Sequence, residues 1–188
     1  MGRWAPDARG RLMRSALELY AERGFDETTA LEIAQRAGVT ERTFFRYFSD
    51  KREVLFEGSS DLQAFVVAAI TAAPSSMASI GAVGTAMESA AALLEGNRDY
   101  ARRRAAVVAA NPSLQERELL KLATLAGAVA DALRRRGVPD LAAGLAAETG
   151  VTVFKIGFET WIGDESTADF AQCIREALDQ LKGLTAGA

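Results

Sequence analysis

The chain has 188 residues, of which 49% are hydrophobic and 25% charged, and its formal net charge is −3. It has no histidine and only one cysteine, Cys173. Nucleophilic sites of the Ser-His-Asp and Cys-His types, zinc sites built on histidine or several cysteines, and disulfides within the chain are therefore excluded. A carboxylate-based hydrolase is not excluded, but no motif favours one. We expect no enzyme activity, no metal and no cofactor.

The hydrophobic residues are not expected to form a membrane span. Charged residues or serine interrupt every apolar stretch before it reaches the ~18 to 20 residues that a span needs. The first residues, Met-Gly-Arg-Trp-Ala-Pro-Asp, contain no apolar core of a secretion signal. A single cysteine also suits a reducing compartment. We therefore expect a cytoplasmic protein with no membrane partner.

Helical periodicity and helix caps recur along the chain, whereas the alternation typical of strands is not sustained. An apolar stripe from Leu12 to Tyr20 predicts the first helix, and Gly24 is placed to end it. The fold class is therefore predicted to be all-α, with about nine helices. The second helix is expected to follow Thr29 and the third to follow Thr40. Ser166 is expected to cap the last helix. The remaining helices are expected to span about 51–69, 79–95, 98–110, 112–136, 140–162 and 166–182.

Residues 28–51 predict two short helices joined by a tight turn. Thr29 and Glu32 form a capping box that starts the first of them. Gly38 permits a left-handed backbone at the turn, and Thr40 can cap the second helix. Two short helices set at a steep angle by such a turn are typical of a helix-turn-helix.

The second of these helices has one apolar and one polar face. Phe44 and Phe48 are four residues apart and are expected to pack inward with Ile33. Guanidinium, hydroxyl and aromatic groups on the other face are suited to guanine, phosphate and thymine methyl groups. Five basic residues against two acidic ones between positions 36 and 52 give a local basic footprint in an acidic chain. The outer face consists of Arg42, Thr43 and Arg46, flanked by Phe45 and Tyr47.

The chain resembles the TetR family of bacterial transcription regulators over about residues 7–58. The resemblance is carried by Ala-Leu-Glu-Ile-Ala-Gln-Arg-Ala-Gly-Val-Thr (30–40), Thr-Phe-Phe-Arg-Tyr-Phe (43–48), Lys51, and Glu-Leu-Tyr-Ala-Glu-Arg-Gly-Phe (18–25). It implies a DNA-binding domain at 7–58, with its motif at about 29–48, and a helical ligand-binding and dimerisation domain at 59–188. It also implies a homodimeric repressor that leaves a palindromic operator when a small-molecule effector binds.

The same resemblance assigns the DNA contacts. Arg42, Thr43 and Phe45 would face the major groove, whereas Tyr47 and Lys51 would hold the phosphate backbone. The family commonly has tyrosine where Phe45 stands, so a hydroxyl contact to phosphate is lost in this chain. It commonly has a small residue where Arg42 stands, so Arg42 adds a candidate base contact. This variant resembles an actinobacterial subset of the family. The full set of implied DNA-binding residues is Thr29, Thr40, Arg42, Thr43, Phe45, Arg46, Tyr47 and Lys51.

Outside such a motif, Arg42, Arg46 and Lys51 would be ordinary solvated residues. Arg36 and Arg52 are as consistent with plain surface positions as with outer phosphate contacts. A helical interaction module that binds no DNA would share the composition and periodicity of this chain, but not the ordered motif at 28–51. The preference for a repressor over an activator follows only from the family default.

The last two predicted helices carry the clearest signal for contact between subunits. Small residues recur along 140–162 and permit close helix approach, and the helix after it has one apolar face. TetR-like regulators dimerise through these helices, and two-fold operators require a two-fold protein. Packing within one chain is the alternative. The candidate interface residues are Gly150, Gly157, Phe170, Ile174, Leu178 and Leu181.

An aromatic stripe along 140–162 is a candidate lining of a ligand cavity, although such stripes are more often plain core. Four arginines between positions 98 and 104 favour either an anionic ligand or a solvated helix face. Cys173 is expected to be a small apolar residue at or near the interface. The candidate pocket residues are Phe65, Met87, Tyr100, Leu120, Phe154, Phe158 and Trp161.

Overall fold

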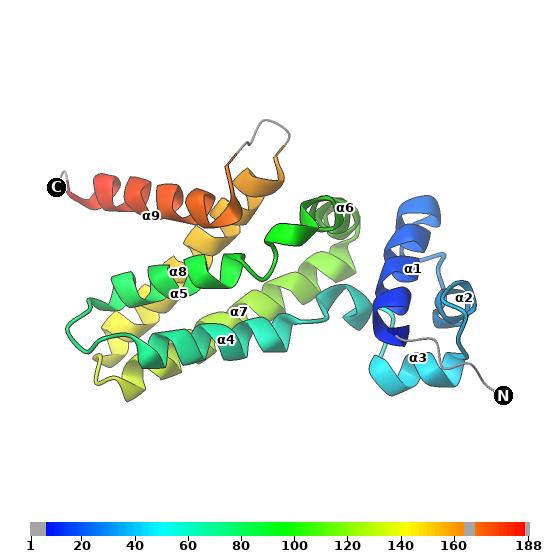
Figure 1. Ribbon diagram of the computed structural model, residues 1–188, viewed down its shortest axis with the longest axis horizontal. Coiled ribbons are helices and arrows are strands. Elements are labelled where there is room, and N and C mark those ends of the chain that lie inside the picture. The colour runs from blue at the N-terminus through cyan, green and yellow to red at the C-terminus, as the bar shows by residue number, and fades with distance from the viewer. Residues whose placement is uncertain (1–6, 164–167, 187–188) are drawn as a thin grey trace. The chain divides into compact units, whose positions relative to one another are not determined.

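The computed structural model describes residues 7–163 and 168–186. These residues form an all-α fold without strands, which confirms the predicted fold class. The helices are α1 (Ala8–Arg23), α2 (Ala30–Arg36), α3 (Glu41–Tyr47), α4 (Ser59–Ala72), α5 (Ser79–Ala91), α6 (Arg98–Ala109), α7 (Pro112–Arg135), α8 (Asp140–Ile162) and α9 (Phe170–Ala186), with two 3-10 turns, η1 (Glu53–Phe56) and η2 (Glu95–Asn97) (Figure 1).

The helices form two compact units. The first contains the residues up to Glu57 together with Arg103–Glu118, and the second contains Gly58–Arg102 and the residues from Leu119 on. Helices α6 and α7 therefore each contribute to both units. The division expected from the sequence, 7–58 and 59–188, follows chain order and does not include this return of residues 103–118 to the first unit.

Helix α1 is the centre of the first unit. Its Leu12, Ala16 and Leu19 are buried, and the helix packs against α2 and η1. The guanidinium of Arg11 donates a hydrogen bond to the carbonyl of Ala37, directly after α2, with an Nε–O distance of 2.9 Å. Both apolar burial and this polar contact therefore hold the helix-turn-helix on α1.

The returning segment 103–118 is joined to η1 by two arginines. Arg117 Nε donates to Glu53 Oε1 at 2.5 Å, and Arg104 Nε donates to the carbonyl oxygen of Leu55 at 2.6 Å. The Arg104 guanidinium also lies 4.9 Å from the centre of the Phe56 ring. The turn that follows the helix-turn-helix is thus held by side chains from α6 and α7.

The fourth helix predicted at 51–69 is interrupted, so the expectation of one continuous helix is wrong. Asp50 Oδ1 accepts hydrogen bonds from the amides of Arg52 (2.7 Å) and Glu53 (3.2 Å), which start η1. Gly58 has φ 82°, a left-handed conformation that ends this turn. Helix α4 then begins at Ser59.

Helix α9 begins later than predicted. It starts at Phe170, where the carboxylate of Asp169 accepts a hydrogen bond from the amide of Gln172 at 2.6 Å. Glu95 Oε2 also accepts the amide of Phe170 at 2.8 Å. The predicted cap, Ser166, lies outside the described residues.

The core of the second unit is centred on α5, which packs against α4, α8 and α9. Val83 and Met87 of α5 are fully buried there. The arginine Arg136 joins α7 to the turn after α4 by donating hydrogen bonds to the carbonyls of Ile70 (2.9 Å) and Pro74 (2.8 Å). This unit is therefore built from an apolar centre with charged side chains closing its loops.

Two segments are, by length and composition, apolar enough to cross a membrane: Glu53–Ala72 and Asp140–Ile162. The expectation that every apolar stretch is interrupted before it reaches this length is therefore wrong for these two segments, whereas the expectation that no membrane span forms stays a prediction. The first segment is divided at Gly58 into η1 and α4. The second is α8, which has apolar side chains in the core of the second unit, among them Ala147 and Val153, and exposed ones such as Leu141 and Leu145. The core position therefore accounts for only part of its hydropathy.

Two glycines allow α8 to approach its neighbours closely. A Cβ at Gly157 would lie 2.9 Å from Ile174 Cγ1 and 3.1 Å from the Ile174 backbone in α9. A Cβ at Gly150 would collide with Val83 in α5. The small-residue stripe of α8 is therefore used for packing within the chain.

This packing corrects the sequence-based interface assignment. The small-residue pattern is the same for a neighbouring helix of the same chain and for one of a second copy, and here the neighbours belong to the same chain. The buried side chains of Phe170, Ile174 and Leu178 are not available to a partner, whereas a contact of Leu181 with a partner stays a prediction. The residues that pack inside their own chain are Gly150, Gly157, Phe170, Ile174, Leu178 and, partly buried, Leu181.

We predict that Gly157→Ala lowers the free energy of unfolding by about 1 to 3 kcal/mol, because the added methyl group overpacks the contact between α8 and α9. Urea denaturation followed by circular dichroism measures this. The matched control is Gly144→Ala in the same helix, where an added Cβ meets nothing within 4 Å. The control should be neutral or stabilising by up to about 1 kcal/mol, because alanine favours helix. Equal stability of the two variants would contradict the packing.

Candidate nucleic-acid interface

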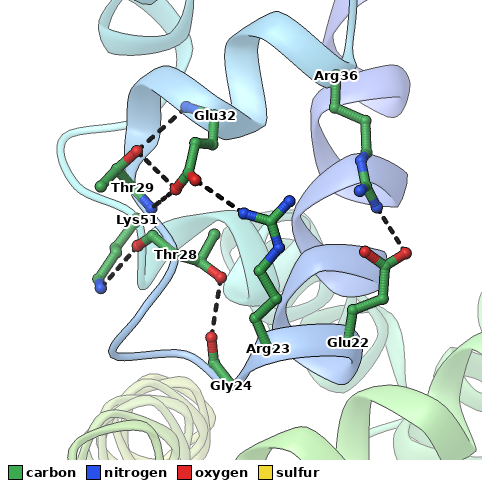
Figure 2. A network of polar contacts seen from close by, with 8 residues as sticks. All are labelled: Glu22, Arg23, Gly24, Thr28, Thr29, Glu32, Arg36 and Lys51. Atoms are coloured by element: carbon green, nitrogen blue, oxygen red, sulfur yellow. Dashed lines mark hydrogen bonds and ion pairs between the residues drawn. The ribbon is translucent and has the colours of Figure 1, made fainter.

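A capping box starts α2, as the sequence predicts. The Thr29 hydroxyl accepts a hydrogen bond from the amide of Glu32 at 3.2 Å, and Glu32 Oε2 accepts the amide of Thr29 at 2.9 Å (Figure 2). Arg23 donates to the other carboxylate oxygen of Glu32 at 2.9 Å. Hydrogen bonds from the backbone and hydroxyl of Thr29, together with the charge of Arg23, lower the pKa of Glu32. Glu32 is thus kept ionised in its cap.

A tight turn sets α3 against α2. Gly38 has φ 68°, the left-handed conformation that glycine adopts readily. The amide of Val39 donates to the carbonyl of Ala34 at 2.9 Å and closes the turn. Thr40 caps α3 by accepting the amide of Thr43 at 3.2 Å. Each of these features lies where the sequence predicts it.

The two faces of α3 differ as predicted. Phe44 is completely buried, and Phe48, directly after the helix, is 3% exposed. On the other face, Arg42 and Arg46 are exposed and the Phe45 side chain is 53% exposed. The outer face of α3 therefore presents two guanidinium groups and an aromatic ring to solvent.

The arginines near this face fall into two groups. Arg36 forms an ion pair with Glu22 at 2.7 Å, and Arg52 forms one with Asp50 at 3.0 Å. Arg42, in contrast, makes no hydrogen bond or ion pair with any residue that the structure describes. Since the charge of Arg42 is not neutralised within this part of the chain, it is available to an external anion or base.

Tyr47 organises a second basic group at the end of α3. The Arg46 guanidinium lies 5.0 Å from the Tyr47 ring centre and donates to the phenol oxygen at 3.3 Å. Arg9 of α1 lies 6.0 Å from the same ring centre and forms an ion pair with Glu57 at 2.9 Å. The sequence did not indicate Arg9, because only tertiary packing brings α1 near Tyr47.

Lys51 has contacts that the sequence did not predict. Its ammonium nitrogen donates to the carbonyls of Phe25 (2.8 Å), Asp26 (3.2 Å) and Thr28 (2.9 Å) in the loop between α1 and α2. An ammonium group has three N–H donors, and each of the three has a carbonyl acceptor here. Figure 2 shows Lys51 pointing to this loop, beside Thr29.

Buried Tyr20 supports the same region. Its hydroxyl donates to the carbonyl oxygen of Lys51 at 2.6 Å. Burial, followed by the negative charge of Asp50, raises the pKa of Tyr20. The phenol is therefore neutral at ordinary pH and remains a donor.

The candidate pocket residues differ widely in exposure. Phe65 and Leu120 are 38% and 52% exposed on the surface of the second unit, whereas Met87 is fully buried and Tyr100 half-buried. The α8 aromatics pack on Phe170, because their helical spacing aims them at α9. Trp161 stacks on Phe170 with a centroid distance of 4.9 Å, and the Phe154 and Phe158 rings lie 5.2 Å and 5.8 Å from it. These three residues form a packed aromatic cluster with Phe170, and their assignment to a cavity lining stays a prediction.

Two of the four arginines at the start of α6 bind backbone carbonyls at the end of α8, whereas Arg103 is exposed. Arg98 Nη2 donates to the carbonyl of Gly163 at 2.8 Å, and Arg102 Nε donates to that of Ile162 at 2.8 Å. Positive charge at the carboxyl end of a helix compensates the helix dipole. Arg98 and Arg102 thus close the end of α8.

A helix-turn-helix whose second helix presents a basic and aromatic face, joined to a larger helical unit, defines the class of one-component DNA-binding regulators. Two family models match this chain. The model of the tetR family of bacterial regulatory proteins matches residues 12–57, and the model of the MftR C-terminal domain matches residues 77–185. The chain belongs to the TetR family of transcriptional regulators.

Individual relatives agree with this family. The chain is 39% identical to the regulator TcmR of Streptomyces glaucescens over 66 residues, which are 35% of this chain and only 29% of TcmR. It is 26% identical over 156 residues to MftR of Mycobacterium tuberculosis, named for transcriptional regulation of mycofactocin biosynthesis, covering 81% of this chain and 79% of MftR.

Solved structures show the same fold. The TetR-family repressor FadR of Thermus thermophilus, in complex with lauroyl-CoA, is 25% identical, with 93% of each chain covered and a TM-score of 0.56. A TetR-family protein of Syntrophomonas wolfei has a TM-score of 0.66 at 16% identity, with 95% of this chain and 94% of that chain covered. At 16% identity, the similarity to the Syntrophomonas wolfei protein shows a shared fold alone.

We predict that Thr29→Ala lowers the free energy of unfolding by about 1 kcal/mol, because the capping hydroxyl of α2 is lost. The matched control is Thr124→Ala, which removes an exposed hydroxyl that bonds the carbonyl of Leu120 within α7. Alanine favours a helix interior, so the control should lose no stability. Urea denaturation of both variants measures the difference, and a Thr29→Ala protein as stable as the control would contradict the role of the cap.

Proposed function

We propose that this protein is a cytoplasmic homodimeric repressor that binds a palindromic operator and is released from it by a small molecule. The observation that carries the proposal is Arg42, whose exposed guanidinium has no partner among the described residues and stands on the outer face of α3. Phe44 and Phe48 are buried on the other side and fix this orientation. A guanidinium held in this way suits bidentate contact with a guanine in the major groove.

The remaining contacts follow from exposure and chemistry. The exposed Phe45 ring beside Arg42 suits a thymine methyl group, and the Thr43 hydroxyl suits a base edge. Phosphate contacts set the register of the protein without reading sequence. We assign these contacts to Thr29, Thr40, Arg46 and Tyr47.

A second copy of the chain is proposed to cover the outer face of α8. Leu141, Leu145 and Ile156 are all exposed there, at 77%, 62% and 48%, and their spacing places them on one side of the helix. Two recognition helices related by two-fold symmetry match the two halves of a palindrome. These outward residues replace the buried set that the sequence suggested.

We predict that the wild-type protein binds a palindrome from the upstream region of its own gene as two protomers, with an affinity that falls steeply as salt rises. Arg42→Ala should weaken binding to the palindrome by about 1 to 3 kcal/mol and binding to random duplex much less. Fluorescence anisotropy on both duplexes measures this. Equal losses on the two duplexes would make Arg42 a phosphate contact, and the absence of a competitor-resistant complex for the wild type would refute the proposed function.

The effector signal is proposed to pass through α6 and α7. Both helices contribute to both units, and in the first unit Arg104 and Arg117 hold η1 through Leu55 and Glu53. Because η1 follows α3 in the chain, a displacement of α6 or α7 would act on the position of α3. The interruption at Gly58 makes a single continuous fourth helix a poor candidate for this coupling.

A long-chain acyl-CoA is the effector class that we propose to test first. The support is the complex of Thermus thermophilus FadR with lauroyl-CoA. An acyl chain is also suited to a unit whose interior is apolar and aromatic. An acyl chain entering beside α8 and α9 would disturb the stack of Trp161 on Phe170, which gives an optical signal.

The chain has two tryptophans, Trp4 and Trp161, so a Trp4→Phe variant keeps Trp161 alone. We predict that lauroyl-CoA changes the fluorescence of Trp161 in this variant. Operator affinity should fall about 5- to 150-fold in parallel, and operator should weaken lauroyl-CoA binding by the same factor. Tight binding with unchanged operator affinity would contradict the release mechanism. No binding would contradict the acyl-CoA class.

A further inference from the structure

We propose that Lys51 is a positioning residue, which contributes to operator affinity by holding the loop between α1 and α2 and not by contacting a phosphate. The inference rests on the proposed DNA-binding function. It changes the role that the family resemblance gives to Lys51, while the other assigned contacts stay as they are.

The first support for this positioning role is that the ammonium group of Lys51 already donates to three backbone carbonyls. Carbonyl oxygens of Phe25, Asp26 and Thr28 lie 2.8, 3.2 and 2.9 Å from its nitrogen. The same nitrogen lies 4.3 Å from the centre of the Phe25 ring, within the range of a cation–π interaction. A phosphate contact would therefore require the ammonium to leave three acceptors and an aromatic face.

The loop has a reason to need this cation. Three carbonyls of a short segment converge on one point, and without a positively charged donor their dipoles would repel one another. The loop is otherwise closed at its start, where Gly24 has φ 88° and its carbonyl accepts the hydroxyl of Thr28 at 2.8 Å. The amide of Thr28 also donates to the carbonyl of Phe25 at 3.3 Å, and Lys51 adds a charged link between the same two residues.

The position of Lys51 is itself fixed from α1. Its carbonyl accepts the Tyr20 hydroxyl at 2.6 Å, and the buried Tyr20 ring packs edge-on against Phe25 at 5.2 Å. The residue therefore links α1, the loop and the segment after α3. Thr28 is fully buried and directly precedes Thr29, the cap of α2, so the loop sets where α2 begins and hence how α3 is held.

A positioning role and a phosphate contact differ in their dependence on charge and salt. Loss of one phosphate contact reduces the slope of log K against log salt by about 0.9. A charge-retaining substitution preserves much of such a contact. Loss of loop geometry leaves the slope unchanged, and arginine does not restore it, because a planar guanidinium cannot meet three converging carbonyls as an ammonium does.

The test compares wild type, Lys51→Met and Lys51→Arg in operator titrations between 50 and 200 mM salt. We expect both variants to bind roughly tenfold or more weakly, with a salt slope equal to that of the wild type. Arg135→Met, which removes an exposed arginine of the second unit, is the control for charge loss and should bind as the wild type does. A lower slope for Lys51→Met, wild-type affinity of Lys51→Arg, or wild-type affinity of Lys51→Met each overturns the inference.

Hydrogen exchange gives a readout independent of DNA. In Lys51→Met the amides of residues 25–33 should exchange faster than in the wild type, while the exchange of the α9 amides stays unchanged. Equal exchange of residues 25–33 in the variant and the wild type overturns the inference. Should the Lys51 variants not fold, Phe25→Leu keeps the lysine and removes the aromatic face. Weaker operator binding by that variant at an unchanged slope supports the clamp, and wild-type binding overturns it. If the wild type itself binds no operator, the DNA-binding proposal fails, which is a separate result.

Discussion

The orientation of α3 is the constraint on which the DNA-binding unit depends. The helix has seven residues, too few to be stable in water without tertiary contacts. Burial of Phe44 and Phe48 supplies those contacts, and the caps at Thr29 and Thr40 start the two helices that make them. Because one side of so short a helix is fixed in the core, its other side must face solvent. The chemistry of Arg42 and its neighbours follows from this packing.

Local chemistry explains why much of this unit could be predicted from the sequence. The hydroxyls of Thr29 and Thr40 accept amides only three residues ahead, and the turn at Gly38 depends on that residue's own conformation. Interactions of this range are encoded in consecutive residues, so spacing alone identifies them. The alternation of buried Phe44 and exposed Phe45 is equally local.

Interactions between distant residues could not be predicted in the same way. The glycine pattern of α8 specifies that a helix approaches closely, but it carries no information on whether that helix belongs to the same chain. The structure places Val83 and Ile174 at these glycines, so the buried residues taken for an interface are core. Similarly, Lys51 carries no local sign that its acceptors lie in the loop after α1. The composition of a helix predicts that a face is apolar, and only the fold decides what covers it.

The electrostatics of the unit explain how an acidic chain can present a basic face. Surface ion pairs contribute little to stability, but they cancel charge locally, and charge beyond a Debye length of about 8 to 10 Å is screened at physiological salt. The paired carboxylates are Glu22, Glu32 and Asp50, with Arg36, Arg23 and Arg52 as partners. Arg42 and Arg46 form no ion pair with a carboxylate among the described residues, and Glu41 is the one acidic residue of α3, so the helix carries a net positive charge. A phosphate approaching α3 is therefore exposed to these two guanidiniums, and the net charge of −3 is carried by side chains elsewhere on the chain.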